Sequence, residues 1–260
     1  MSFFRVITPN FNNREWLNKC IGSVLNQTFK DYDFIFIDDC STDGSLDTAG
    51  ELIRDDGLAI GYRTKVWNGG ARNKGLLCHD DAKYTLFLDS DDWFHDNKVF
   101  QDLHDFIVDH DYPDCIRLPY NVEYDGDKSV NVMLDDNTIE KLVRSNFCAC
   151  WSKCVKSELI PPFPENTLME DAVQHIKQCD LIHSLEVFTD RPVYTHNRNN
   201  GNSCSIEKNH DLQNSKWKSS MYRYMADLLD LELEHDYCEA ERKRRSEKCL
   251  ADIKKGLYIQ

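Results

Sequence analysis

Short apolar runs alternate with amphipathic segments along the amino-terminal part of the chain. The runs at 3–7, 34–37, 59–62 and 84–88 are β-prone and predict buried strands. Between them, apolar side chains recur at helical spacing and predict helices at 16–25, 45–54 and 71–78. Asn12, with Glu15 three residues later, predicts a capped start for the first helix. Because strands and helices of these lengths alternate, we expect an α/β fold with a parallel sheet covered on both faces.

The rest of the chain has a less regular pattern. It predicts a helix at 98–108, a hairpin formed by 114–124 and 130–133, a helix at 138–143, a short helix beginning near 170 and a strand at 185–194. Residues 197–205 are rich in Asn, Gly and Ser and predict a mobile loop. From Ile206 the apolar side chains return to a helical period. We therefore expect a domain at residues 1–205 and a helical extension at 206–260, which packs on the domain, mediates homo-oligomerisation or contacts an acceptor.

Composition and charge narrow the classes of function. The chain has 260 residues and a formal net charge of -14, which disfavours the basic surface that broad nucleic-acid binding requires. No apolar run has the form of a signal peptide or the length of a transmembrane segment. Eleven cysteines scattered along such a chain are typical of reduced thiols, so we expect a cytoplasmic protein.

A cluster of carboxylates directly follows the strand expected at 84–88. Asp89, Asp91 and Asp92 stand together there, an arrangement that is costly to bury unless a cation or solvent meets it. In open α/β sheets, ligands bind at the carboxyl ends of the strands, where this cluster is expected. Hard oxygen ligands of this kind suit Mg²⁺ or Mn²⁺, which share their shell with substrate phosphates. The alternative is a solvated turn that caps the next helix.

Four stretches of sequence, taken together, carry a family resemblance. They are VITPNFN (6–12) with SVLNQT (23–28), IDDCSTDGS (37–45), NGGARNKG (68–75) leading to LDSDDW (88–93), and WSK (151–153) with MED (169–171). In this order and spacing they resemble the inverting, metal-dependent, GT-A-type glycosyltransferases of family two. The resemblance implies a Rossmann-like, mostly parallel sheet with helices on both faces, followed here by the helical extension.

The resemblance also implies a site for a nucleotide-sugar donor. The residues expected there are Thr8, Pro9, Asn10, Phe11, Asp39, Arg72, Asp89, Ser90 and Arg198. Phe11 offers a ring on which a base can stack, although packing against Trp16 competes for it. By the family pattern, Asp39 accepts the uracil N–H. The fixed charge of Arg72 suits either nucleotide oxygens or a neighbouring carboxylate.

The family pattern further divides the metal, acceptor and catalytic roles. It gives Asp91 the cation, Mn²⁺ or Mg²⁺, and it gives Asp89 the ribose hydroxyls or a supporting position beside the metal. His196 is a further candidate ligand, with an ordinary loop histidine as the alternative. Asp171 is the candidate general base. On the acceptor side we expect Glu170 and Trp151, although a core position is an equally simple reading of Trp151.

These residues lead to one functional expectation with two alternatives. We expect a non-processive enzyme that moves one sugar from a nucleotide diphosphate, uridine-based by the family pattern, to a hydroxyl of a glycan or other acceptor. A nucleotidyltransferase also ends strands with metal-binding carboxylates, but it would have a glycine-rich phosphate loop, which residues 8–13 lack. The other alternative is a non-catalytic sugar- or nucleotide-binding scaffold on the same fold.

Overall fold

The computed structural model places two sheets and their covering helices in the part of the chain that it describes. That part comprises residues 1–78, 82–124, 128–133, 138–144, 148–165, 167, 169–200 and 215–257. Within it, seven strands form the larger sheet in the order β10-β6-β9-β4-β1-β2-β3. They are β1 (Phe4–Asn10), β2 (Tyr32–Asp38), β3 (Leu58–Gly61), β4 (Tyr84–Phe87), β6 (Cys115–Arg117), β9 (Lys153–Lys156) and β10 (Leu185–Val187). The predicted parallel core of this sheet is confirmed, since β1 runs parallel to both β2 and β4.

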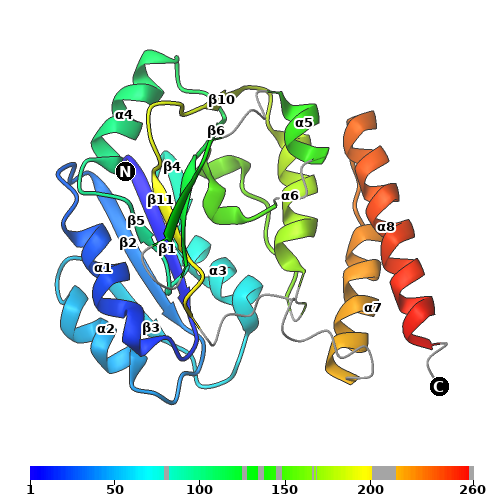
Figure 1. The fold of residues 1–260 in the computed structure, drawn as a ribbon, viewed down its shortest axis with the longest axis horizontal. Coiled ribbons are helices and arrows are strands. Elements are labelled where there is room, and N and C mark those ends of the chain that lie inside the picture. Colours follow the sequence, from blue (N-terminus) through cyan, green and yellow to red (C-terminus); the bar gives the residue numbers. More distant parts are fainter. Residues whose placement is uncertain are drawn as a thin grey trace.

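Helices cover both faces of the larger sheet, as the sequence predicts. They are α1 (Leu17–Leu25), α2 (Ser45–Ile53), α3 (Trp67–Cys78) and α4 (Val99–Asp109), with the 3₁₀ turn η1 (Arg14–Trp16) before α1. Figure 1 shows α1, α2 and α4 on one side of the sheet and α3 on the other. The expected Asn12 cap is wrong, because its side-chain oxygen instead accepts the Thr42 N–H at 2.8 Å. Asn12 thus joins two loops at the ends of β1 and β2.

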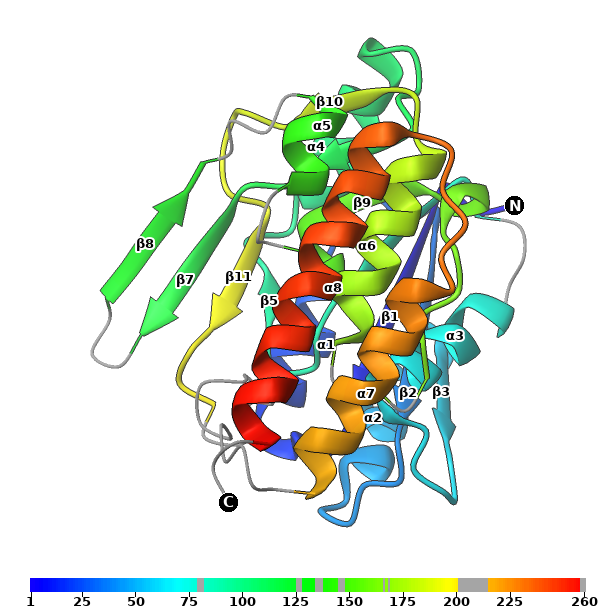
Figure 2. The same ribbon diagram turned by 90° about the vertical axis from the view of Figure 1, so that its right-hand side faces the viewer.

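A smaller sheet stands beside the first. Among the described residues its strands are β5 (Trp93–Phe94), β11 (Tyr194–Asn197), β7 (Tyr120–Tyr124) and β8 (Lys128–Val132), in that order. The predicted hairpin is confirmed, since β7 and β8 pair antiparallel. Figure 2 shows β7, β8 and β11 projecting beside the helices.

Two predicted strands are wrong as single elements. The segment 114–124 is divided between β6 in one sheet and β7 in the other, and 185–194 is divided between β10 and β11. The sequence analysis also missed β9, which lies antiparallel between β4 and β6. Its short run carries lysines at both ends, so it lacks the apolar pattern of the other central strands.

The remaining helices form a layer in which the others pack around α6. They are α5 (Ile139–Arg144), α6 (Glu170–Leu181), α7 (Ser215–Leu229) and α8 (Asp236–Leu257), with the 3₁₀ turns η2 (Cys150–Ser152) and η3 (Ser157–Leu159). The two views agree that α7 and α8 lie side by side along α6 (Figures 1 and 2). This confirms the expected carboxyl-terminal helices. The boundary at 205/206, and most of the loop expected at 197–205, lie outside the described residues.

Two glycines let α3 approach its neighbours closely. A Cβ at Gly75 would lie 2.5 Å from Ile7 Cγ2, and one at Gly69 would collide with the carbonyl oxygen of Pro164. Side chains at these positions would push α3 away from β1 and from the loop before α6. The glycines therefore set the position of Arg72, which lies between them on the same helix.

No helix in the described part of the chain is both long enough and apolar enough to cross a membrane.

Candidate active site

The candidate site forms where β1, β2 and β4 end. Asn10 closes β1, Asp38 and Asp39 follow at the end of β2, and the carboxylate cluster begins just after β4. Because these strands are parallel neighbours, their carboxyl ends meet at one edge of the sheet. The start of α6 adds Glu170 and Asp171 to this edge. The topology thus gathers residues that are far apart in the sequence.

Arg72 forms ion pairs with three carboxylates at this edge. It is 2% exposed, and its guanidinium donates to Glu170 Oε1 and to Asp171 Oδ1 at 2.9 Å each. Its other terminal nitrogen donates to Asp89 Oδ1 at 3.0 Å. Of the two roles that the sequence leaves open for Arg72, the structure therefore places it on neighbouring carboxylates. A buried arginine that joins three carboxylates is suited to fix their positions.

Glu170 and Asp171 occupy different environments although they are adjacent. The Glu170 side chain is 9% exposed, whereas that of Asp171 is 27% exposed. Burial, followed by the negative charge of Asp171, raises the pKa of Glu170 to about 7. Burial also raises the pKa of Asp171, although the charge of Arg72 opposes this. Asp171 is thus the more accessible carboxylate, while Glu170 lies inside the ion-pair network.

Asp39 holds the turn that leads into α3. Its two carboxylate oxygens accept the N–H groups of Val66 at 2.5 Å and Trp67 at 2.9 Å. Trp67 has a φ of 64°, a left-handed conformation that is strained for an aromatic residue. The carboxylate stabilises this turn, and burial raises its pKa. Asp38 instead accepts bonds from the Asn10 amide and the Ser41 N–H, so it holds the loop after β2 to the end of β1.

Among the described residues, the Asp91 carboxylate bonds an amide side chain and no cationic one. Its Oδ2 accepts a bond of 2.7 Å from Asn200, whose amide also donates to Asn13 Oδ1 at 3.0 Å. Asn13 in turn donates to the buried Ser90 hydroxyl at 2.9 Å. Burial and the charges of Asp92 and Asp89 raise the pKa of Asp91 to about 7. A bound cation would relieve this accumulation of charge.

His196 pairs with Asp92 rather than with Asp91. Its Nδ1 lies 3.2 Å from Asp92 Oδ2, which also accepts a 2.6 Å bond from the Tyr194 hydroxyl. Although burial lowers the pKa of His196, the bond to Asp92 and the charge of that carboxylate raise it. Within the described part of the chain, no group of three or more His, Cys, Asp or Glu side chains could hold a metal. The expected trio of Asp91, Asp89 and His196 therefore does not converge in this structure.

The other expected site residues are divided between surface and core. Thr8, Pro9 and Asn10 are buried in β1, whereas the Phe11 ring is 36% exposed and lies beneath Lys65 Nζ. The Arg198 side chain is exposed just after β11.

Trp151 has the core position that the sequence left open as an alternative. Its side chain is 4% exposed and its ring stacks on Tyr194 at 4.3 Å between centroids. It also stacks on His196 at 5.2 Å. Trp151 thus supports the ring pair behind Asp92 and presents no open wall to an acceptor here.

The sequence analysis missed several residues that order this edge. They are Asn13, Asn200, Asn197, Tyr194 and the pair Lys153–His175. Asn13 and Asn200 carry a weak signal, since each belongs to an asparagine-rich stretch that follows a strand. The others have no local signal, because their partners are distant in sequence.

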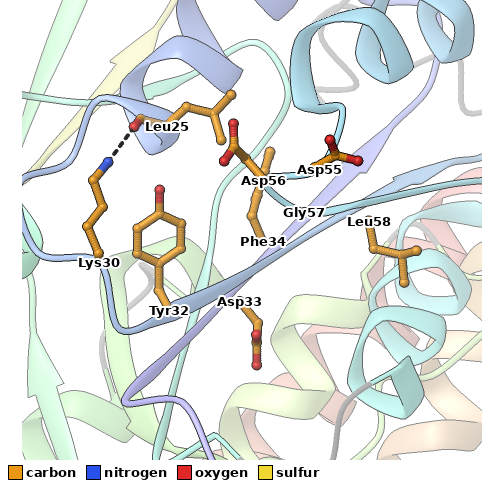
Figure 3. A pocket seen from close by; sticks show the side chains of 9 residues that line it. All are labelled: Leu25, Lys30, Tyr32, Asp33, Phe34, Asp55, Asp56, Gly57 and Leu58. Atoms are coloured by element: carbon orange, nitrogen blue, oxygen red, sulfur yellow. Dashed lines mark hydrogen bonds between the residues drawn. The ribbon is translucent and has the colours of Figure 1, made fainter.

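One concavity adjoins this edge: a cavity of about 620 Å³ is lined by the segments after β1 and β2, including Asn12, Thr42 and Asp43. Another does not. A cavity of about 590 Å³ lies around the start of β2, lined by residues that include Lys30, Tyr32 and Asp56. Figure 3 shows Lys30 bonded to the Leu25 carbonyl beside it, at 2.9 Å. No residue of the carboxylate network lines this cavity. It lies at the amino ends of the strands, away from the candidate site.

A family model decides the classification. The model described as "Glycosyl transferase family 2" matches residues 5–154, which include Asp39, Arg72 and the whole cluster after β4. The chain belongs to glycosyl transferase family 2. The resemblance inferred from the four stretches is therefore confirmed.

Relatives within glycosyl transferase family 2 cover parts of the chain. TarP of Staphylococcus aureus, named a poly(ribitol-phosphate) beta-N-acetylglucosaminyltransferase, is 37% identical over 141 residues, covering 52% of this chain and 42% of TarP. Glycosyltransferase GlyA of Streptococcus pneumoniae is 24% identical over 247 residues, covering 87% of this chain and 34% of GlyA. The chain spans about two fifths of the length of TarP and of TuaG, a putative teichuronic acid glycosyltransferase of Bacillus subtilis.

Solved structures confirm the fold. The crystal structure of S. aureus TarS residues 1–349 with UDP-GlcNAc superimposes with a TM-score of 0.72 at 21% identity, covering 97% of this chain and 72% of that one. The mannosyltransferase PcManGT of Pyrobaculum calidifontis, with GDP-Man and Mn²⁺, gives 0.65 at 12% identity, covering 98% and 74%. These likenesses establish the GT-A-type α/β architecture expected from the sequence.

Proposed function

We propose that this protein is a metal-dependent, inverting glycosyltransferase. It moves one sugar from a nucleotide diphosphate, UDP in the first instance, to a hydroxyl group of an acceptor without processive elongation. The observation that carries this proposal is the set of hydrogen bonds that Arg72 donates to carboxylates. One guanidinium fixes Asp89, at the end of a central strand, and Asp171, at the start of α6. Arg72 therefore connects the proposed donor side of the site rigidly to the proposed acceptor side.

Asp171 is the general base in this proposal. Its side chain is the more exposed of the two acidic side chains at the start of α6. Its raised pKa makes the carboxylate a stronger base than an ordinary aspartate. As the acceptor oxygen forms its bond to the anomeric carbon, its proton passes to Asp171. The bond from that carbon to the diphosphate breaks on the opposite face, so the configuration inverts. Arg72 keeps the Asp171 carboxylate fixed during this transfer.

One carboxylate of the cluster, that of Asp91, suits a hard divalent cation. Asp91 offers a carboxylate that lies among other negative charges and whose partner among the described residues is an amide, so it would hold Mn²⁺ or Mg²⁺ together with donor phosphates. A bound metal would offset the charge that develops on the departing diphosphate. Asp92 keeps His196, Tyr194 and the backbone of Asn197 in place beside it. Their bonds hold β11 against the cluster after β4.

Donor and acceptor are proposed from the relatives. TarS is described with UDP-GlcNAc and PcManGT with GDP-Man and Mn²⁺, so both nucleotides should be screened. TarP is named for poly(ribitol-phosphate), which makes such a polymer the first acceptor to test. The screen measures nucleoside diphosphate release from UDP-GlcNAc, UDP-glucose and GDP-mannose with Mn²⁺ and with EDTA. Metal-dependent UDP binding without any transfer would favour the scaffold alternative, and pyrophosphate release from a nucleoside triphosphate would favour a nucleotidyltransferase.

The substitution Asp171→Asn tests the assignment of the base. Asparagine keeps an oxygen for Arg72 but cannot take a proton. We expect turnover to fall by about 10²–10⁴-fold while UDP affinity stays unchanged. Glu158→Gln, which removes an exposed carboxylate from η3, is the matched control and should be neutral. Full turnover in folded Asp171→Asn would place the base elsewhere, and a loss of UDP binding would place Asp171 in the nucleotide site.

A further inference from the structure

A lysine and a histidine form a buried pair behind the candidate base. Lys153 begins β9 and is 1% exposed, and His175 on α6 is fully buried. Their side chains meet with Nζ 2.9 Å from Nδ1. His175 lies four residues after Asp171 on the same helix, so the two side chains share one face of α6. The pair therefore connects the middle of the large sheet to the element that carries the base.

The hydrogen bonds determine the tautomer of His175. The His175 Nε2 lies 2.9 Å from the Leu142 carbonyl, which can only accept a hydrogen bond, so Nε2 carries the proton. Nδ1 is then unprotonated and accepts from the Lys153 ammonium. Burial and the positive charge of Lys153 lower the pKa of His175 well below its ordinary value. His175 is thus the neutral member of the pair, and Lys153 is the member that carries a positive charge when its side chain is an ammonium.

The charge of Lys153 lacks a local counterion. Among the described residues, no carboxylate lies within salt-bridge distance of its ammonium, and His175 is its hydrogen-bond partner. Lys156, at the other end of the same strand, instead bonds Asp114 at 2.7 Å and is 29% exposed. A buried ammonium without a paired carboxylate is costly to keep in a fold. The position of Lys153 behind the carboxylate network points to an electrostatic effect of its positive charge on those carboxylates.

We propose that Lys153, held by the neutral ring of His175, is a positioning residue for Asp171. Its fixed charge keeps the Asp171 carboxylate ionised and oriented for the incoming acceptor. The charge opposes both the burial of that carboxylate and its negative neighbours. Arg72 binds Asp171 directly, and Lys153 adds a second positive charge that no substrate ligand can displace. This inference rests on the proposed role of Asp171 as the base.

Other groups also face Asp171, and the test must separate them from Lys153. They are Arg72 from α3, Asp89 from the end of β4, Glu170 on α6, and Cys148 and Cys150 before β9. None of them is altered by substitutions at Lys153. A change in Asp171 that follows the charge at position 153 therefore reports on the lysine.

The experiment is a direct titration of the Asp171 carboxyl carbon by ¹³C NMR in the full chain labelled at aspartate. The Asp171 resonance is identified by its loss in Asp171→Asn. We expect Lys153→Met and Lys153→Gln to raise the pKa of Asp171 by about one unit or more, and Lys153→Arg to leave it close to the wild-type value. Lys153→Gln can still donate to His175, so it removes the charge while keeping the bond. Lys156→Met, on the same strand, is the matched control and should produce no shift.

The outcomes are decisive without knowledge of the sugar or acceptor. A folded Lys153→Gln protein with an unchanged Asp171 titration would overturn the proposal, as would failure of both neutral variants to fold, which would make Lys153 a folding requirement. Where transfer is measurable, the acidic limb of the turnover profile should move to higher pH with the KM for donor unchanged. If wild-type protein shows no transfer but the titration shifts as expected, the electrostatic coupling stands and only the proposed function fails.

Discussion

At the scale of single residues, Asp91 shows how charge is concentrated at this edge of the sheet. Its carboxylate is partly buried, and Asp92 and Asp89 stand beside it. Its pKa of about 7 lies well above the value of an unfolded chain, near 4. The folded state therefore binds a proton more tightly than the unfolded state, so stability falls as the pH rises from about 4 to about 7. Above neutral pH the metal-free protein retains this repulsion.

Asp91→Asn should remove the repulsion and the metal ligand together. We expect its Tm in EDTA at pH 8 to rise by about 2–4 °C, because the amide keeps the shape without the charge. We also expect Mn²⁺ with UDP to raise the Tm of the wild-type protein but not that of the variant. Thermal scans of both proteins, with exposed Asp47→Asn as control, would check this. An equal Mn²⁺ response in Asp91→Asn would show that Asp91 does not hold the cation.

Residues whose role follows from their position at a strand end could be predicted from the sequence. The cluster after β4 and the pair at the end of β2 are of this kind, because a polar residue that follows an apolar run is visible locally. Asn13 and Asn200 are different, since they meet across 187 positions in sequence. Tyr194 likewise reaches Asp92 only through the pairing of β11 with β5. Such contacts depend on the complete topology, which periodicity does not encode.

At the scale of elements, the first four strands and three helices follow the sequence pattern closely. Most of their apolar side chains are buried in the core around the larger sheet, so the local pattern carries most of the information. The later strands follow the pattern less closely, because β9 enters the sheet between β4 and β6, and among the described strands the chain crosses five times between the sheets. A short strand paired with distant partners has little local signature. The short helix expected near residue 170 is confirmed, and the candidate base Asp171 lies in its first turn.

Asp180 joins the carboxyl-terminal helix to α6. Its oxygens accept the N–H groups of Glu234 at 2.7 Å and His235 at 2.8 Å, just before α8 begins. Although burial raises the pKa of Asp180, these two bonds outweigh it, and the pKa lies below the ordinary value. The stabilisation is therefore present above the unfolded pKa, near 4, and is lost as the pH falls through the folded value.

Asp180→Ala should loosen this connection. By analogy with the loss of a helix cap, we expect it to cost about 1–2 kcal/mol in the free energy of unfolding at pH 7. The difference from wild type should shrink below about pH 4, where the carboxyl group is protonated in both states. Urea denaturation at pH 7 and at low pH measures both effects, with exposed Asp190→Ala as the neutral control. A difference that does not change with pH would mean that the carboxylate charge is not involved.

At the scale of the whole molecule, the helical extension shares a core with the sheet. A second hydrophobic cluster includes Cys115 of β6 and Val155 of β9 together with buried side chains of α5, α6, α7 and α8. The same α6 that carries the proposed base therefore lies between the sheet and the final two helices. The division at 205/206 is a change in sequence character, and the packing argues that the two parts are one folding unit.

If the two parts fold as one unit, heat should unfold the full chain in a single transition. Calorimetry and loss of UDP binding should then give the same midpoint, because the site depends on α6 and α6 depends on the extension. Adjacent leucines of α7 supply a matched pair of variants: Leu228 is fully buried and Leu229 is 59% exposed. Leu228→Ala should cost about 2–5 kcal/mol and lower both midpoints together, while Leu229→Ala should change stability by less than about 0.5 kcal/mol. Two separate transitions, with UDP binding retained after the first, would show that residues 206–260 are an independent domain and that the base is held by the sheet alone.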